Sequence, residues 1–235
     1  MTTVPGIDLE AFFKISYGLY IVSAGNSSKK SGYISNAVFQ VTAEPVQFAV
    51  CCSKNNYTAS LISENRAFAI SVLKKDADQS LISTFGYKSG KDIDKFSGVK
   101  SITGVTGAPI VTVDSLAWFE CRVVQTIDVG THFLFTAEIV NTRLIEDGEP
   151  LTYSHYREER KGKAPKNAPT YIDPAKNQKK ISESEKYKCL LCGHVYDPSE
   201  GDPEGKIPAG TEFKDLPESW QCPICGADKG SFDRI

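Results

Sequence analysis

Two short stretches near the end of the sequence, CLLCG (residues 189–193) and CPICG (residues 222–226), repeat one cysteine pattern. In each stretch two residues separate the cysteines, so one tight turn presents two sulfurs to the same metal ion. The glycine that follows permits a positive φ, which lets backbone N–H groups point at the sulfurs. The four thiolates therefore predict one tetrahedral site for iron or zinc. Two disulfides are the alternative, and spacing alone does not choose between the metals.

Composition narrows the classes of protein to which the chain can belong. The chain has 235 residues, 40% of them apolar, and a net charge of −2, which argues against a general nucleic-acid binder. No apolar run reaches the length of a membrane helix, so we expect no membrane partner. The first residues lack the basic and apolar regions of a secretory signal, and we expect a cytoplasmic protein. Thiols stay reduced there, and the odd count of seven cysteines further weakens the disulfide alternative.

The distribution of charge divides the sequence into three parts. Residues 1–156 are nearly neutral, with 13 basic and 15 acidic side chains. Residues 157–188 are basic, at 10 against 5, and contain three prolines, whereas residues 189–235 are acidic, at 4 against 9. This pattern predicts a larger domain, a connector whose later part is a solvated linker, and a small second domain.

The larger part is rich in β-branched and aromatic runs of strand length. Short helices are expected after Asp8, from about Asn56 through residues 57–65, and over residues 76–85 with Gly86 just beyond the end. Many strands with few helices predict a barrel rather than a doubly wound sheet. Cys51, Cys52 and Cys121 fall in predicted strands, where buried cysteine is common, and we expect them in the core. The predicted strands are 20–24, 37–43, 46–52, 68–73, 109–113, 117–127 and 132–145.

The residues between the two cysteine loops point to one family. They run, in order, YDP (196–198), GDP (201–203), IPAGT (207–211), Phe213, DLP (215–217) and Trp220. Across residues 187–235 this closely resembles rubredoxin. The resemblance implies a single iron that carries one electron, with Cys189, Cys192, Cys222 and Cys225 as its ligands. It also implies a small aromatic core of Tyr187, Tyr196, Phe213, Trp220 and Phe232. His194 departs from the common pattern, and we expect it exposed rather than bound to the metal.

A polar cluster marks a candidate ligand site in the larger part. No Walker A loop or strand–GxGxxG–helix unit is present there. Instead, residues 32–45 contain many small, hydroxyl and amide side chains, and a second polar group lies just where a helix is expected to begin. That group is Ser53, Lys54, Asn56 and Thr58. A helix N-terminus with a lysine and hydroxyl donors is a site for phosphate, and the alternative is a helix cap beside a solvated lysine.

The order of short motifs from residue 8 to residue 172 resembles the flavin reductase-like, FMN-binding split-barrel family. They are GYISNA (32–37), VTAEP (41–45), SKNNYT (53–58), residues 65–73, FG (85–86), DKF (94–96), GTH (130–132) and PKNAPTY (165–171). The expected fold is therefore mainly β with short helices, a Greek-key split β-barrel followed by a small rubredoxin-like iron domain. The predicted domains are residues 1–172 and 187–235, with a linker over 173–186.

The same resemblance implies roles for individual residues. Those expected to line the isoalloxazine are Ser35, Asn36, Ala37, Val38, Cys51, Cys52 and Ser53. Those expected to hold the FMN phosphate are Lys54, Asn56 and Thr58. His132 is the candidate catalytic residue beside the flavin or nicotinamide, although Thr131 stands where many members have Asp, and a strand histidine with an ordinary hydrogen bond is the alternative. His155 is expected either at the flavin or at the surface.

A flavin reductase-like domain joined to a rubredoxin resembles the high-molecular-weight rubredoxins of anaerobes. The resemblance implies transfer of electrons from NAD(P)H through FMN to iron and on to an acceptor protein such as a flavodiiron oxygen or nitric oxide reductase. It also implies a homodimer, in which the iron of one subunit could serve the flavin of the other. The alternatives are a carrier that has no NAD(P)H site and a non-enzymatic module that binds flavin and zinc. The sequence leaves NADH and NADPH undecided.

Overall fold

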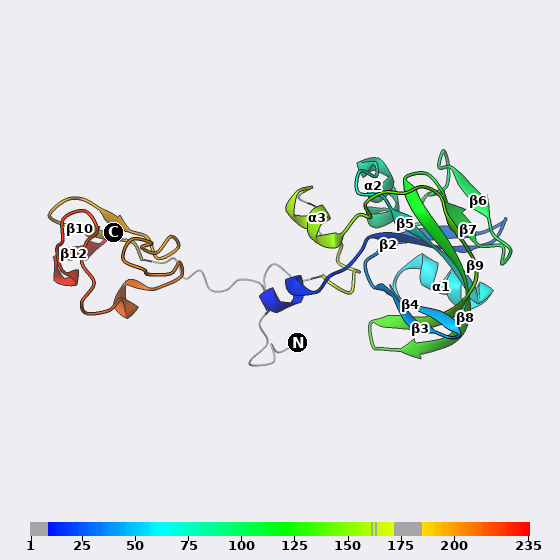
Figure 1. The fold of residues 1–235 in the computed structure, drawn as a ribbon, viewed down its shortest axis with the longest axis horizontal. Coiled ribbons are helices and arrows are strands. Elements are labelled where there is room, and N and C mark those ends of the chain that lie inside the picture. The colour runs from blue at the N-terminus through cyan, green and yellow to red at the C-terminus, as the bar shows by residue number, and fades with distance from the viewer. Residues whose placement is uncertain (1–8, 161, 163, 172–184) are drawn as a thin grey trace. The chain divides into compact units, whose positions relative to one another are not determined.

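The computed structural model describes residues 9–160, 162, 164–171 and 185–235. It divides the chain into two units, residues 1–173 and residues 174–235, and each is described by itself (Figure 1). The linker predicted over residues 173–186 lies outside the described residues apart from its last two, and so does the expected helix cap Asp8. A 3-10 helix, η1 (Leu9–Lys14), occupies the place of the first predicted helix.

One seven-stranded sheet, antiparallel throughout, forms the first unit. Its strand order is β2-β1-β5-β8-β9-β4-β3, so β2 and β3, which follow one another in the chain, lie at its two edges. The sheet curls to join them, and Tyr33 of β2 donates a hydrogen bond of 3.0 Å to the backbone oxygen of Cys51 in β4. The strands are β1 (Tyr20–Gly25), β2 (Lys30–Ser35), β3 (Val38–Ala43), β4 (Val46–Ser53), β5 (Ala67–Leu73), β8 (Ser115–Asp128) and β9 (His132–Leu144).

Most of these strands follow the sequence pattern, and the predicted mainly β class is confirmed. In this sheet the pattern missed β2, because its KSGYIS sequence contains a lysine and a glycine, which are depleted in strands. Gly32 is needed there, since a Cβ at this position would lie 2.9 Å from the ring of Phe85. The predicted strand 109–113 is shorter, β7 (Pro109–Val111), and pairs with β6 (Ser101–Thr103), which was also missed.

Two helices cover the sheet and divide its core. Helix α1 (Tyr57–Asn65) begins as expected at the cap residue Asn56, whose side chain accepts the N–H of Thr58 at 3.0 Å. It buries Leu61 and Ile62 against the inner strands. Helix α2 (Gln79–Tyr87) buries its apolar face in a second cluster with residues of β1 and β5. A third helix, α3 (Tyr153–Glu158), follows the sheet.

The boundaries predicted for α2 are wrong at both ends. The helix begins at Gln79 rather than Asp76, because Asp78 acts as its cap and accepts the N–H of Ser80 at 2.6 Å. It also continues through Gly86, which was expected beyond its end. Gly86 therefore does not terminate this helix, and Lys88 in an extended conformation does.

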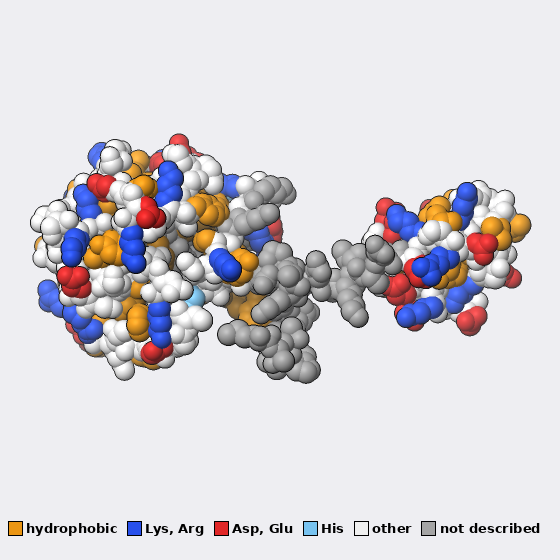
Figure 2. Space-filling model, turned by 180° about the vertical axis from the view of Figure 1, so that it is seen from behind, with side chains coloured by type: hydrophobic (Ala, Val, Ile, Leu, Met, Phe, Trp, Pro, Cys, Tyr) orange, Lys and Arg blue, Asp and Glu red, His pale blue; other side chains and the backbone are white. Residues whose placement is uncertain are grey.

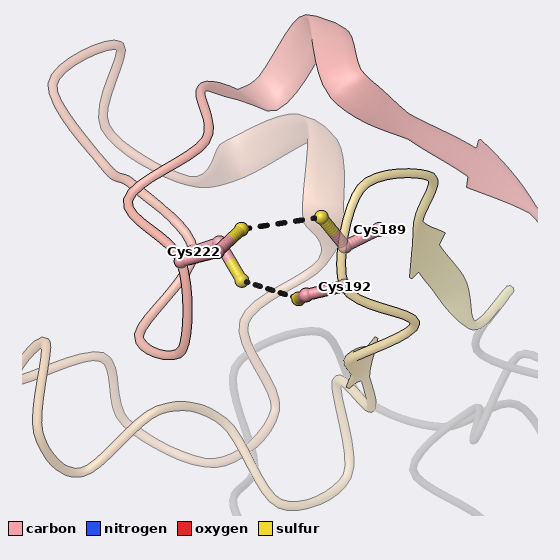
Figure 3. A group of neighbouring side chains, drawn as sticks. Cys189, Cys192 and Cys222 are labelled. Atoms are coloured by element: carbon pink, nitrogen blue, oxygen red, sulfur yellow. Dashed lines mark hydrogen bonds between the residues drawn. The ribbon is translucent and has the colours of Figure 1, made fainter.

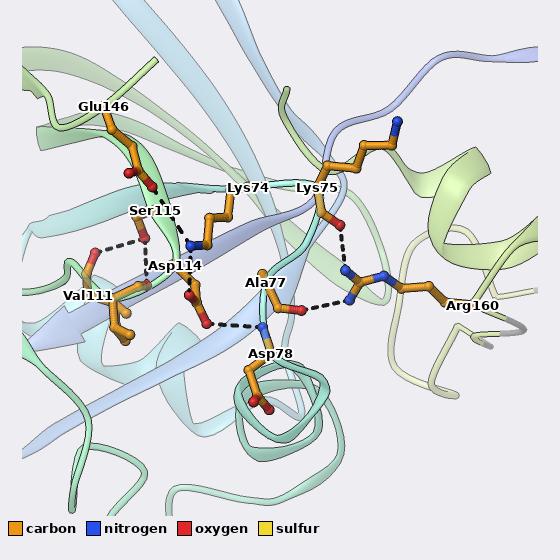
Figure 4. A network of polar contacts seen from close by, with 10 residues as sticks. Lys74, Lys75, Ala77, Asp78, Val111, Asp114, Ser115, Glu146 and Arg160 are labelled. Atoms are coloured by element: carbon orange, nitrogen blue, oxygen red, sulfur yellow. Dashed lines mark hydrogen bonds and ion pairs between the residues drawn. The ribbon is translucent and has the colours of Figure 1, made fainter. Parts of the chain in front are cut away.

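A network of charged side chains fixes the start of α2 (Figure 4). Asp114 accepts the backbone N–H of Asp78 at 3.0 Å and lies 3.3 Å from the ammonium of Lys74. Glu146 lies 3.9 Å from the same ammonium. Arg160, beyond α3, donates to the backbone oxygens of Ala77, at 2.7 Å, and Lys75. These long-range contacts act together with the local Asp78 cap to set where the helix starts.

The second unit is a small three-stranded sheet packed on aromatic rings. Its order is β11-β10-β12, and the rings of Tyr187 and Phe213 stack with centroids 4.0 Å apart. Trp220 donates its indole N–H to Asp202 at 2.8 Å. All five aromatic residues predicted for this core contact one another there. The elements are β10 (Tyr187–Cys189), β11 (Val195–Tyr196), η2 (Phe213–Asp215), η3 (Lys229–Ser231) and β12 (Phe232–Arg234).

Two features of the surface bear on the choice of partners. Acidic and basic side chains are interspersed over the visible face of both units, without a large patch of one sign (Figure 2). No helix within the described ranges has the length and apolar character needed to cross a membrane.

A buried carboxylate provides the first prediction. Glu120 of β8 is fully buried and accepts the backbone N–H groups of Val105, at 3.0 Å, and Thr106, at 2.5 Å. Its contacts hold the turn between β6 and β7, and a Cβ on Gly104 would lie 2.2 Å from its oxygen. Glu120→Gln turns an NH2 group toward these donors, so we expect a loss of about 1–3 kcal/mol in the free energy of unfolding, measured by urea denaturation.

The matched control is Glu138→Gln in the neighbouring strand β9, where the carboxylate is exposed. We expect this substitution to leave the free energy of unfolding nearly unchanged. Equal effects of the two substitutions would mean that the turn does not depend on the charge of Glu120.

Candidate metal centre and ligand cleft

The second unit brings the four predicted ligands together (Figure 3). The Sγ atoms of Cys189 and Cys225 lie 3.7 Å apart, those of Cys192 and Cys222 lie 3.6 Å apart, and all four are within 4.8 Å of one another. Four sulfurs bound to one ion at about 2.3 Å lie about 3.8 Å from their neighbours. A disulfide would place two sulfurs about 2.05 Å apart. The arrangement fits a tetrahedral metal ion and not a pair of disulfides.

Both cysteine loops use the same backbone geometry. Gly193 and Gly226 have φ values of +79° and +73°, and each donates its N–H to the oxygen of the first cysteine in its loop, at 2.9 and 2.8 Å. His194 has a backbone role, because its oxygen accepts the N–H of Cys189 at 2.8 Å. Its side chain is not in the group that can share a metal ion, and it is half-buried rather than exposed as expected.

Two of the four cysteines are exposed. Cys189 and Cys222 are buried, whereas Cys192 and Cys225 are exposed. Their neighbours Leu191 and Ile224, one in each loop, are also exposed, at 74% and 69%. The centre can therefore be approached closely by another molecule at an apolar surface.

The first unit contains a cleft where the end of β4, the start of α1 and the end of α2 meet. Its cavity volume is about 230 Å³, and it is open to solvent on one side. The loop that runs from Pro165 to Pro169 forms one of its walls. The other walls are lined by Tyr33, Ile34, Cys51, Ser53, Asn55, Asn56, Tyr57, residues 85–89 and Lys95.

The residues expected at the isoalloxazine are only partly brought together. Cys51 and Ser53 line the cleft. Ser35 is buried, and its hydroxyl has no hydrogen-bond partner among the described residues. Asn36 donates to the hydroxyl of Thr170 at 2.7 Å. The remaining three lie elsewhere: Ala37 lines a neighbouring pocket, Val38 packs against the core, and Cys52 is within it.

The cysteines outside the metal centre are largely core residues, as expected. Cys52 and Cys121 are fully buried, and burial raises the pKa of each thiol to about 12. Cys51 is only half-buried, and burial raises its pKa as well. The expectation of a core role is therefore wrong for Cys51, which lines the cleft instead.

The four residues of the expected phosphate cluster do not face one ligand. Ser53 and Asn56 line the cleft, where Asn56 serves as the cap of α1. Lys54 instead contacts both oxygens of Asp128 at 2.6 Å. Thr58 is fully buried, and its hydroxyl donates to Ser31 at 3.2 Å. The sequence pattern placed Lys54 and Thr58 at the phosphate because it shows neither the partner carboxylate nor the packing of α1 on β2.

The charged residues of the cleft are ones that the sequence pattern did not single out. They are Lys88, Lys95 and Lys166. Lys95 is 3% exposed, and its ammonium donates to the backbone oxygens of Gly32 at 2.8 Å and Phe85 at 3.1 Å. Burial lowers its pKa to about 8, so the charged form still predominates at neutral pH. The DKF motif that contains Lys95 is one of several motifs whose order resembles the family. The motif by itself does not indicate that this lysine is buried.

The two candidate histidines lie at different places. His132, at the start of β9, contacts the hydroxyl of Thr131 through Nδ1 at 2.8 Å and the backbone oxygen of Asn167 through Nε2 at 3.2 Å. Because Asn167 lines the cleft, His132 supports its wall. His155 lies in α3 with Nδ1 3.4 Å from Glu159, and it lines a pocket with Lys74 and Arg160 rather than the cleft.

Comparisons with known proteins match both units. The family described as flavin reductase like domain matches residues 12–161, and rubredoxin matches residues 186–232. High molecular weight rubredoxin from Moorella thermoacetica is 41% identical over 229 residues, 97% of this chain and 100% of that protein. Ferric-chelate reductase (NAD(P)H) from Archaeoglobus fulgidus is 45% identical over 167 residues, 71% of this chain and 99% of that protein.

A solved structure shows the same fold as the first unit. It is the NADH:FAD oxidoreductase of Streptomyces globisporus C-1027, with a TM-score of 0.56 and 21% identity, over 64% of this chain and 93% of that one. At this identity the likeness concerns the fold alone. It agrees with the predicted split barrel.

These findings confirm both resemblances and decide between the metals. A rubredoxin domain with four cysteines binds iron, and a flavin reductase-like domain binds flavin. The chain is thus an oxidoreductase by family. It belongs to the flavin reductase-like family and, like high molecular weight rubredoxin, joins that domain to a rubredoxin.

Proposed function

We propose that this chain takes electrons from NAD(P)H onto FMN and passes them singly through the iron centre to an acceptor protein. The observation that carries the proposal is that one chain holds both a polar cleft in its flavin reductase-like domain and a four-thiolate centre in which two of the cysteines are exposed. A bound flavin can accept the two electrons of a hydride together and release them one at a time. An iron centre accepts one electron at a time, so the flavin links the two steps. The name of the Archaeoglobus relative supports NAD(P)H as the donor.

The cleft offers groups that suit a flavin. Ser35 follows the cleft residue Ile34 in β2, and its buried hydroxyl has no partner among the described residues; a buried hydroxyl in that state favours a ligand that bonds to it. Ser53 and Cys51 provide polar and polarisable atoms on the facing strand. We propose these residues, with Asn36, as the ones that orient the ring. His132 is proposed as the group that positions the Asn167 wall beside the nicotinamide.

The exposed sulfurs indicate where electrons leave. Cys192 and Cys225 lie at the surface beside exposed Leu190, Leu191 and Ile224. Apolar contact over an exposed ligand brings a partner's redox centre close, and the acidic excess of residues 189–235 steers a basic partner. We propose an acceptor protein of the flavodiiron class as the partner at this surface.

The edge strand β3 supports a homodimer. Its side chains are largely exposed, and among them Phe39 and Val41 are 53% and 45% exposed. An exposed apolar edge strand is a liability unless another surface covers it. We propose that a second copy of the chain covers this strand, and that the chain acts as a homodimer.

Loss of one exposed ligand tests the metal assignment. We expect Cys192→Ser or Cys225→Ser to abolish the visible absorption of the ferric thiolate centre while flavin remains bound, because the two sites lie in separate units. Metal analysis and the visible spectrum of the purified protein measure both. Cys121→Ala, which removes a buried thiol of the first unit, is the control and should keep the full iron content. Full iron in a Cys192/Cys225 double variant would refute the four-cysteine assignment.

The order of electron transfer can be tested in the intact chain. Anaerobic NADH or NADPH should bleach the flavin and then the iron, because a hydride carries two electrons and the iron accepts one. The chain depleted of flavin should keep its red iron centre, and NAD(P)H should leave it oxidised until FMN is added back. Stopped-flow absorbance follows the two centres separately.

Three outcomes would contradict the proposal in different ways. If iron were bleached at the same rate without flavin, transfer through flavin would be wrong. If neither nucleotide reduced the complete protein but a reduced redox protein did, the chain would be a carrier without an NAD(P)H site. A colourless protein that contains zinc would support the non-enzymatic alternative.

A further inference from the structure

A second hollow of the first unit, which we call the aromatic pocket, lies beside the cleft. Its cavity volume is about 340 Å³, which is within the range of small-molecule sites. Most of the described residues that line it are aromatic or aliphatic, and none of them is charged. The cleft, in contrast, is lined by several lysines. The rings of the aromatic pocket are those of Phe12, Phe13, Tyr17, Tyr153 and Tyr171.

Pairing of two segments that are far apart in the chain brings these rings together. Gly18 forms a β-bridge with Thr152, and the N–H of Tyr153 donates to the backbone oxygen of Tyr17 at 2.8 Å. The two tyrosine rings then meet edge to face, with centroids 6.3 Å apart. This arrangement is favourable because the positive edge of one ring points at the negative face of the other. The backbone thus fixes two walls of the aromatic pocket.

The edge of the aromatic pocket offers no free charge to an ionic ligand. The guanidinium of Arg157 lies over the ring of Phe13, at 4.0 Å from its centroid. Its charge is balanced by Glu158, whose carboxylate is 2.6 Å away. An ion that entered the aromatic pocket would lose hydration without gaining a counter-charge. The chemistry of the walls therefore favours an uncharged ligand.

Polar groups in the aromatic pocket are all hydroxyls, and three of them are available. Among the described residues, the hydroxyls of Tyr17, Tyr153 and Tyr171 have no hydrogen-bond partner. A phenol hydroxyl can donate to an oxygen of a ligand. Phe12 and Ile15 are 49% and 51% exposed, so a ligand that covers them removes apolar surface from water. Rings and hydroxyl donors together suit a planar apolar compound that carries acceptor oxygens.

The aromatic pocket is next to the cleft rather than remote from it. Ala37 lines the aromatic pocket, and its backbone oxygen accepts the N–H of the cleft residue Cys51 at 3.0 Å. Pro169 lines both hollows. A compound in the aromatic pocket therefore lies beside a ligand of the cleft.

We propose that the aromatic pocket binds an uncharged quinone, whose carbonyl oxygens accept the hydroxyls of the three tyrosines, and that the chain reduces this quinone. Reduction to the hydroquinone takes two electrons and two protons. NAD(P)H supplies a hydride and solvent supplies the second proton, so that NAD(P)H, a proton and the quinone give NAD(P)+ and the hydroquinone. The activity rests on the proposed function for its electron donor, whereas the binding site does not.

Binding is tested first, in the full-length protein with its flavin and iron and without nucleotide. The probe is 2,3-dimethyl-1,4-naphthoquinone, whose methyl groups block addition of thiols, and 2,3-dimethylnaphthalene is the matched compound without oxygens. The test variant combines Tyr17→Phe, Tyr153→Phe and Tyr171→Phe. We expect the Kd of the quinone, from equilibrium dialysis, to rise by about ten- to a hundredfold, because neutral hydrogen bonds are lost. The Kd of the hydrocarbon should stay nearly unchanged, since the rings remain.

Matched controls separate the hydroxyls from the apolar walls. Tyr187→Phe removes a phenol hydroxyl of the second unit and should change neither Kd. Phe12→Ala removes an exposed ring of the aromatic pocket and should weaken the quinone and the hydrocarbon alike. Val105→Ala, which shortens an exposed apolar side chain between β6 and β7, should weaken neither.

Three results would overturn the proposal. The first is that the wild-type protein does not bind the quinone. The second is that the triple variant loses affinity for quinone and hydrocarbon equally, which would mean that the hydroxyls only support the fold. The third is that the KM for NADH, with ferricyanide as acceptor, rises in the triple variant by the same factor as the Kd of the quinone. That result would assign the aromatic pocket to the nicotinamide.

Anaerobic turnover tests the activity and distinguishes its failure from that of the proposed function. With NADH or NADPH as donor, the KM for the quinone should rise in the triple variant. If wild-type protein oxidises NAD(P)H but does not bind the quinone, the inference is wrong and the proposed function stands. If neither nucleotide is oxidised but protein whose flavin has been reduced by light converts the quinone to hydroquinone, the site stands and the proposed electron donor is wrong.

Discussion

Two residues, Asn36 and Ala37, separate the strands that form the opposite edges of a seven-stranded sheet. So short a connection cannot cross an open sheet, so the sheet must close on itself. At the seam, Tyr33 donates to the oxygen of Cys51, and the N–H of Cys51 donates to the oxygen of Ala37. The cleft lies beside this seam, where helix ends and the 165–169 loop replace regular strand pairing. The position of the ligand site thus follows from one topological constraint.

What the sequence predicted well depends on local chemistry. The strand over residues 46–52 can be predicted because it is a nearly continuous run of apolar residues. The start of α1 can be predicted because Asn56 caps it by contacting a residue two positions away. The cysteine loops are also local, since each pair of sulfurs comes from one turn. A fold class and a metal centre that depend on such short-range patterns can be predicted from the amino-acid sequence alone.

The parts that could not be predicted depend on residues far apart in the chain. Strand β2 looks unlike a strand because Gly32 must leave room for Phe85, which is more than fifty positions away. The start of α2 depends on Asp114. Lys54 resembles a phosphate ligand until Asp128 is seen beside it, and Lys95 resembles an ordinary surface lysine until its burial is known. Polar site residues are hardest to assign because their partners are set by the packing of distant elements.

The metal centre has a further property that comes from its uneven burial. In each cysteine loop the first sulfur belongs to the aromatic core, and the second belongs to the surface. Leu191 and Ile224, which directly precede the second cysteine of each loop, are exposed as well. Natural variation at these outer positions can change which molecules the centre meets without disturbing the rings that hold it. Partner choice in this small unit can therefore evolve separately from its folding.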